Sequence, residues 1–200
     1  LCLDKTGTLT EGNMKIEKAV LFPGADSAMF QEWMGNFLTH AQDNNATFQA
    51  MYTYFDGMDT LSVTEQIPFS SDRKWSAMTF SGAGTLVIGA PERLSPEKLP
   101  ESVLEAQQNG KRVLLAGITQ HAVQKEQPLP EMQLLAEIIL TDPLRANAAK
   151  TIAAFQQEGV SVKLISGDNP MTASAMAQQA GIFQSDRWVD MRTVADSEMD

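Results

Sequence analysis

Hydrophobic positions recur with two different periods along the chain, and the period changes with position. Near both ends, short apolar runs alternate with segments of helical spacing, a pattern typical of strand–helix units in a parallel sheet. The pattern predicts strands at 1–3, 160–165 and 187–190, and helices at 145–159 and 170–180.

The middle of the chain has the pattern of an antiparallel sheet with helices packed on it. The segment Ser81-Gly82-Ala83-Gly84 lies between two apolar runs and predicts a hairpin turn. Strands are predicted at 14–21, 63–68, 75–80, 85–88, 112–117 and 134–140, and helices at 26–46, 47–55, 99–109 and just after Pro91. The pattern therefore predicts an outer domain, residues 1–13 and 141–200, split by an inserted domain, residues 14–140.

The composition narrows the classes of protein that the chain can belong to. A hydrophobic content of 43% and a charged content of 20% are typical of a soluble globular chain, and a net charge of −10 argues against nucleic acid as a partner. No run approaches the roughly 20 apolar residues of a membrane span. The single cysteine, Cys2, excludes an intramolecular disulfide and is expected to be buried in the first strand. Because the chain begins in mid-strand without a Met, we expect a piece of a longer protein.

The segment Asp4-Lys5-Thr6-Gly7-Thr8-Leu9-Thr10 carries the strongest chemical signal of the chain. An apolar strand that ends in Asp4 presents a carboxylate nucleophile at the carboxyl end of the strand, where open α/β sheets bind ligands. Threonine hydroxyls and the backbone N–H groups of a glycine-broken loop can surround a phosphoryl group, and Lys5 adds a positive charge. This segment alone also allows a plain strand-to-loop turn.

The whole heptad resembles the phosphorylation motif of P-type (E1–E2) ATPases, which belong to the haloacid-dehalogenase-like superfamily. The resemblance implies that Asp4 accepts the γ-phosphoryl group of ATP, that Lys5 and Thr6 are catalytic, and that Thr6, Gly7 and Thr8 contact the phosphate. Phosphatases of this superfamily usually carry a second Asp at the position of Thr6. Because a threonine hydroxyl cannot take up and return a proton near neutral pH, Thr6 favours an ATPase over a phosphatase.

Two further segments resemble the nucleotide site of the same family. Phe69-Ser70-Ser71-Asp72-Arg73-Lys74 is similar to the adenine-site motif of the P2 branch, which implies that Phe69 stacks on the base and Lys74 reaches the nucleotide. Gly89-Ala90-Pro91-Glu92 matches most of the family's KGAPE segment, so Gly89 is expected to let the nucleotide approach. Ile88 stands where that family usually has a lysine. Without the first heptad, the segment 69–74 would be interpreted as a polar turn between strands rather than as a nucleotide site.

The remaining motifs of the resemblance concern the phosphates and the metal. Arg112, in GKRVLLA, and Arg145, in DPLR, are expected to meet nucleotide phosphates. Ser166, Gly167 and Asp168, before a helix that begins at Pro170, are expected to bind the transferred phosphoryl group. The resemblance implies that Mg²⁺ is held by Asp4, the carbonyl of Thr6 and an Asp of a further motif, which in this family normally follows the segments named above.

The resemblance therefore implies a fold, a function and a set of partners. The fold is an incomplete, split Rossmannoid phosphorylation domain of the haloacid-dehalogenase-like class with an inserted α+β nucleotide-binding domain. The function is that of the cytoplasmic region of a cation-transporting ATPase in a cell membrane. The implied cofactors are ATP and Mg²⁺, and the implied partner is the rest of the ATPase chain. The fragment itself is expected to be monomeric. Heavy metals are disfavoured, because His40 and His121 are each followed by Ala and not by the Pro found in heavy-metal pumps. The FSSDRK segment resembles the P2 branch and favours Ca²⁺. The alternatives are a haloacid-dehalogenase-like phosphatase and a module that, as an isolated fragment, binds ATP without chemistry; the fragment alone is expected to be inactive.

Overall fold

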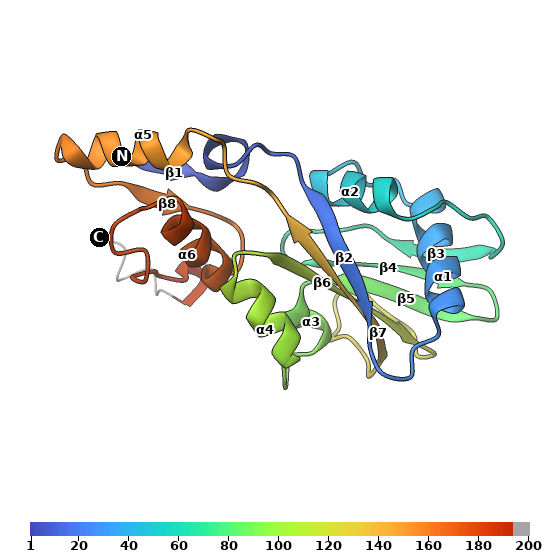
Figure 1. Ribbon diagram of the computed structural model, residues 1–200. Coiled ribbons are helices and arrows are strands. Elements are labelled where there is room, and N and C mark those ends of the chain that lie inside the picture. The colour runs from blue at the N-terminus through green and yellow to red at the C-terminus, as the bar shows by residue number, and fades with distance from the viewer. Residues whose placement is uncertain (194–200) are drawn as a thin grey trace. The chain divides into compact units, whose positions relative to one another are not determined.

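The computed structural model describes residues 1–193, which form two compact units (Figure 1). Unit 1 comprises Leu1–Asn13, Glu105–Arg112 and the chain from Asp142 onward, and unit 2 comprises Met14–Leu104 and Val113–Thr141. The mixed α/β architecture that the hydrophobic pattern predicts is confirmed. No helix in the described part of the chain has both the length and the apolar character that crossing a membrane requires.

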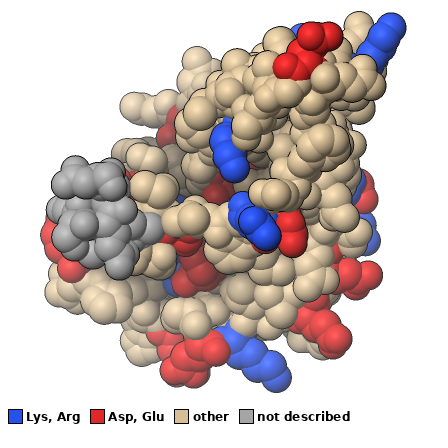
Figure 2. Space-filling view, turned by 90° about the vertical axis from the view of Figure 1, so that its left-hand side faces the viewer, with Lys and Arg blue, Asp and Glu red and all other residues tan. Residues whose placement is uncertain are grey.

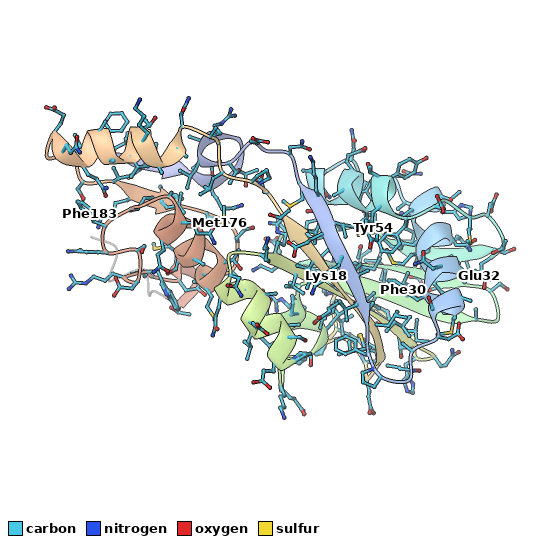
Figure 3. All side chains as sticks on the ribbon, in the orientation of Figure 1. Lys18, Phe30, Glu32, Tyr54, Met176 and Phe183 are labelled. Carbon is cyan, nitrogen blue, oxygen red and sulfur yellow. The ribbon has the colours of Figure 1, made fainter. Side chains whose placement is uncertain are left out.

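Unit 1 is built around two short parallel strands, β1 (Cys2–Asp4) and β8 (Lys163–Ile165). The helices α5 (Ala148–Gln157) and α6 (Pro170–Gln179) belong to the same unit. Met176, labelled in Figure 3, lies on α6, and its sulfur would be only 3.0 Å from a Cβ added at Gly110. The small core of the unit consists of Leu9, Ala148, Ile152, Val162, Ala177, Ala180 and Ile182.

Local chemistry explains where the elements of unit 1 begin. The side chain of Asn169 accepts a hydrogen bond from the Met171 N–H at 2.9 Å, and Pro170 occupies the first turn, so α6 begins where the sequence predicts. α5 begins at Ala148 and not at residue 145, because Asn147 is not helical (φ −98°, ψ 0°).

Two expectations for unit 1 are wrong. Residues 187–190 form no strand in the structure, and Trp188 and Val189 are 51% and 68% exposed, because no described strand lies beside them. Cys2 is exposed and not buried, since the residues of β1 alternate between the two faces of the sheet and only Leu3 is partly covered.

Unit 2 contains a six-stranded sheet in the order β2-β7-β6-β5-β4-β3. Its strands are β2 (Lys15–Leu21), β3 (Val63–Ile67), β4 (Trp75–Phe80), β5 (Gly84–Gly89), β6 (Arg112–Thr119) and β7 (Gln133–Thr141). The helices α1 (Ser27–His40) and α2 (Ala46–Tyr54) cover one face, and α3 (Pro91–Leu94) and the start of α4 (Glu101–Gln108) lie at the other (Figure 1).

The main core lies between α1, α2 and the sheet. Phe30, labelled in Figure 3, and Trp33 are 1% and 5% exposed, and the ring of Trp33 meets that of Phe80 edge-on at 5.4 Å. The single helix predicted to run to residue 46 ends at His40, because Ala41 is extended and Asn45 caps α2 by accepting from the Phe48 N–H. The aromatic residues at helical spacing are therefore core residues.

A buried amide joins α1 to the loop that follows α2. Asn36 is completely buried; its Nδ2 donates to the Glu32 carbonyl at 2.7 Å, and its Oδ1 accepts from the N–H groups of Thr60 and Leu61 at 2.9 and 2.8 Å. Backbone N–H groups that lose such an acceptor inside a protein remain desolvated and unpaired. Asn36 therefore fixes the path of the loop against the helix.

Asn36→Ala should lower the free energy of unfolding of unit 2 by about 2–4 kcal/mol, because two backbone N–H groups lose their acceptor. Urea unfolding followed by tryptophan fluorescence measures the change. The matched control is Asn44→Ala, which removes an exposed amide in the loop between α1 and α2. It should change the free energy of unfolding by less than about 0.5 kcal/mol. Equal effects of the two variants would contradict this role of Asn36.

Candidate functional site

The carboxyl ends of the two parallel strands bring Asp4 and the loop 166–169 to one edge of the unit 1 sheet. Leu3 pairs with Leu164 and Asp4 with Ile165, so the next residues of both strands leave the sheet at the same edge. The side chain of Asp4 is exposed there. Parallel sheets bind their ligands at this edge, so Asp4 is accessible to a ligand approaching the loop.

The loop after Asp4 is a wide turn, Lys5–Leu9, in which Thr6 and Gly7 leave the helical region. Gly7 has a φ of +76°, which a glycine adopts without strain. The Thr10 N–H donates to the Lys5 carbonyl at 3.0 Å, and the Gly7 N–H donates to the Thr10 hydroxyl at 3.2 Å. Thr6, Gly7 and Thr8 are exposed at the surface of this turn, as contacts to a phosphoryl group require.

Lys5 lies inside unit 1 and forms an ion pair there. Its side chain is 5% exposed, and its Nζ lies 2.9 Å from Asp168 Oδ2 and 4.0 Å from Asp142 Oδ2. Asp168 also binds Arg112 through its other carboxylate oxygen. The structure thus brings together three residues that the sequence singles out, Lys5, Arg112 and Asp168, from segments that are far apart in the chain.

The two cations determine the protonation of Asp168. Burial disfavours a charged carboxylate, but the charges of Arg112 and Lys5 outweigh it and hold the pKa of Asp168 below its ordinary value of 3.8. Asp168 is therefore ionised throughout the physiological pH range.

Two residues of the DPLR segment hold the Asp4 loop. The Thr10 hydroxyl donates to Asp142 Oδ2 at 2.6 Å, inside the unit. The guanidinium of Arg145 donates to the carbonyls of Gly7 and Thr8 at 2.7 and 3.1 Å. The phosphate contact expected of Arg145 stays a prediction, and its described contacts are with the loop backbone. Sequence reasoning did not find the Thr10–Asp142 bond, because no local pattern joins residues 132 positions apart.

The loop before α6 has the features of an anion site. The Asp168 N–H donates to the Ser166 hydroxyl at 3.1 Å, and Gly167 is exposed with no atom within 4 Å of a Cβ built on it. The N-terminus of α6, a helix of ten residues, follows directly. Unpaired N–H groups and the helix dipole at such an end favour a negatively charged ligand.

A second group of predicted site residues, Phe69, Lys74 and Gly89, belongs to unit 2. Phe69 is 44% exposed in the loop before β4, an exposure that suits stacking on a base. Lys74 Nζ lies 3.2 Å from Glu92 Oε1, a contact that the sequence did not predict. Ile88, where the resembling family has lysine, is 2% exposed in the core and supplies no charge.

Gly89 is required by the sheet itself. It pairs with Trp75 across β4 and β5, and a Cβ added to it would lie 2.5 Å from the Trp75 Cβ and 2.7 Å from the Lys74 carbonyl oxygen. Only glycine allows this approach. The role expected for Gly89, room for a nucleotide, stays a prediction beside this structural one.

Charges on the described surface are mixed in sign. Figure 2 shows Asp and Glu side chains beside Lys and Arg side chains on the face that it presents. Within residues 1–193, no three His, Cys, Asp or Glu side chains gather in a way that could hold a metal ion. The Mg²⁺ ligands that the resemblance implies, the Asp4 carboxylate and the Thr6 carbonyl, stay a prediction.

Comparison with known proteins gives a consistent result. The profile of one family, described as "Hydrolase: haloacid dehalogenase-like hydrolase", matches residues 1–197. The chain is 38% identical over 202 residues to the protein named "Probable cation-transporting ATPase exp7" of Streptococcus pneumoniae serotype 4, and covers 26% of it. All of this chain lies in that alignment.

Other relatives extend the comparison. The "Calcium-transporting ATPase CtpE" of Mycobacterium bovis is 35% identical over 191 residues, which cover 91% of this chain and 23% of that protein. The crystal structure of a zinc-transporting PIB-type ATPase matches with a TM-score of 0.51 and 21% identity, over 90% of this chain and 27% of that one. This structural likeness supports the fold. The chain spans about a quarter of the length of the curated relatives that it matches.

Asp168→Asn should destabilise unit 1 by about 3 kcal/mol at neutral pH, because it leaves the buried Lys5 without its close partner. Since the pKa of Asp168 is lower in the folded than in the unfolded chain, its stabilisation is complete above pH 3.8 and is lost as the pH falls through the folded pKa. The difference between wild type and variant should therefore shrink on acidification below pH 3.8.

Urea unfolding at a series of pH values, followed through NMR signals of α5 and α6, measures this difference. Asp186→Asn, which removes an exposed carboxylate of the same unit, is the control and should have little effect at any pH. A difference between wild type and Asp168→Asn that stays constant down to about pH 2 would contradict the ion pair.

Proposed function

Because the chain belongs to the haloacid dehalogenase-like hydrolase family, we propose that it is the nucleotide-binding and phosphorylation region of a cation-transporting P-type ATPase. The observation that carries the proposal is the position of Asp4 at the carboxyl edge of β1, beside the loop that precedes α6. Unit 1 would then act as the phosphorylation domain and unit 2 as the nucleotide-binding domain. The names of the relatives support the same class of activity.

In the proposed reaction, a carboxylate oxygen of Asp4 attacks the γ-phosphorus of ATP. The new bond forms as the bond between the γ-phosphorus and the bridging oxygen breaks, and ADP leaves with the electron pair. Thr6, Gly7 and Thr8 would hold the transferred group from one side, and Ser166, Gly167 and the N-terminus of α6 from the other. Lys5 would contribute its positive charge from inside the unit, where Asp168 fixes its position.

Magnesium fits this site through hard oxygen ligands, which are the ones that Mg²⁺ prefers. The Asp4 carboxylate and the Thr6 carbonyl would hold the ion, and it would neutralise charge on the phosphates. Thr6 has a second consequence. Since it cannot act as a general base for water, the aspartyl phosphate should persist long enough to be coupled to a change of conformation.

In unit 2, Phe69 would stack on adenine and Lys74 would meet the ribose or phosphates. Arg112 and Arg145 are further candidates for phosphate contacts. Ca²⁺ is the cation to test first, because two arguments agree: the FSSDRK segment, and relatives whose names describe calcium transport. The location would be the cytoplasmic face of a membrane protein, and the partner would be the rest of the same ATPase.

Phe69→Ala should weaken ATP and adenosine binding to the 200-residue chain by about 1–3 kcal/mol, the range for a stacked base. We expect wild-type dissociation constants from high micromolar to millimolar, since one stacked ring and a few exposed charges are worth about 4–6 kcal/mol. NMR titration gives both values. The control Tyr52→Ala removes an aromatic ring of unit 2 that is 58% exposed and should leave binding unchanged. Undiminished binding by Phe69→Ala would remove Phe69 from the site.

Asp4→Asn should abolish phosphoenzyme formation, tested in a protein as long as the relatives, in which this chain is one region. With labelled ATP and Mg²⁺, the wild type should give an acid-stable, hydroxylamine-sensitive phosphoprotein, because a carboxylate nucleophile forms an acyl phosphate. ATP binding should survive in Asp4→Asn, since the predicted base contacts lie in unit 2. Glu11→Gln, an exposed carboxylate that follows the same loop, should still be labelled. Label on Asp4→Asn, or on a hydroxyl side chain, would overturn the proposal in favour of a phosphatase or a binding module.

A further inference from the structure

The backbone of Lys74 is in an unusual conformation. Its φ is +59°, in the left-handed region that residues with a side chain adopt at an energetic cost. Two hydrogen bonds maintain it: the Lys74 N–H donates to the Ser70 carbonyl at 2.7 Å, and the Lys74 carbonyl accepts from the Ala90 N–H at 2.9 Å. The direction in which the Lys74 side chain leaves the chain is therefore set by the fold.

The same pairing brings Glu92 to Lys74. Trp75 pairs with Gly89 in the ladder between β4 and β5, Ala90 follows β5 directly, and Glu92 lies in the first turn of α3. The ion pair, 3.2 Å from Nζ to Oε1, joins side chains that are 20% and 33% exposed. The contact thus follows from sheet register and the start of a helix, and it is only partly screened by water.

The other basic residues of this segment are bound to backbone carbonyls. Within residues 69–94, Arg73 donates to the Pro68 carbonyl at 2.6 Å and lies over the Trp75 ring at 5.3 Å, and Arg93 donates to the Asp72 carbonyl at 3.3 Å. Of these three basic residues, only Lys74 forms an ion pair with a carboxylate in the part of the chain that the structure describes. A phosphate group can replace that carboxylate as the partner of the ammonium group.

We propose that Glu92 competes with nucleotide phosphates for the ammonium group of Lys74, an inference that rests on the proposed function of unit 2. Without nucleotide, the carboxylate of Glu92 holds the ammonium group of Lys74. When a nucleoside diphosphate or triphosphate binds, its phosphates must take Lys74 from Glu92. Glu92 therefore lowers the affinity for phosphorylated ligands and leaves that for the nucleoside unchanged.

Glu92→Gln in the 200-residue chain tests this by NMR titration with ADP and with adenosine at low salt. ADP should bind about 3- to 5-fold more tightly to the variant, the worth of a partly exposed ion pair, and adenosine should bind equally to both proteins. The gain in affinity for ADP should disappear at about 0.5 M salt. Glu97→Gln, an exposed carboxylate that changes the net charge by the same amount, should leave both affinities unchanged.

A second pair of variants separates competition for Lys74 from direct repulsion between Glu92 and the phosphates. In a Lys74→Gln background, Glu92→Gln should no longer change the affinity for ADP, because no ammonium group remains to be released. If Glu92→Gln still raises the affinity for ADP in that background, Glu92 does not act through Lys74. In the chain that retains Lys74, weaker ADP binding by Glu92→Gln, or an equal rise in the affinity for adenosine, would also overturn the proposal. If the wild-type chain binds neither ADP nor adenosine, the proposed function of unit 2 is refuted, and this inference is refuted with it.

Discussion

The buried charge of Lys5 is the constraint on which the rest of unit 1 depends. An ammonium group with 5% of its side chain exposed must be paired, because an isolated charge away from water costs several kcal/mol. Asp168 pairs with it, and Arg112 binds the other oxygen of Asp168. These ion pairs join three segments of the chain, one of which carries the exposed Asp4. The residue that follows the proposed nucleophile therefore stabilises the fold as well as contributing charge.

Several residues that a motif marks as functional have a structural task that the motif does not express. Arg145 holds two carbonyls of the Asp4 loop, Thr10 binds Asp142, and Gly89 allows close pairing with Trp75. These tasks give the loops a fixed geometry, which the proposed phosphoryl transfer would require because catalysis of that kind depends on positioning. A substitution at any of them would disturb the fold and the site together.

Sequence reasoning reached the features that depend on neighbouring residues. The apolar run before Asp4, the cap and Pro170 that begin α6, and the hairpin at 81–84 are local signals, and the structure has an element at each place. It failed at residues 187–190, where tertiary context decides, because they have the composition of a strand but no described neighbour to pair with. The error at the end of α1 is of another kind, because Asn45, which caps α2, is itself a local signal. The contacts Lys5–Asp168 and Lys74–Glu92 join residues that only the fold brings together.

Both candidate sites contain a lysine that is bound to a carboxylate, but the two pairs differ in how readily the partner can be replaced. The side chains of Lys5 and Asp168 are 5% and 6% exposed, so separating them would leave two desolvated charges. Lys74 and Glu92 are 20% and 33% exposed, so water can solvate either side chain when the other binds elsewhere. Burial thus makes the first pair a permanent part of unit 1. Exposure makes the second pair exchangeable, as the proposed binding and release of a nucleotide by Lys74 would require.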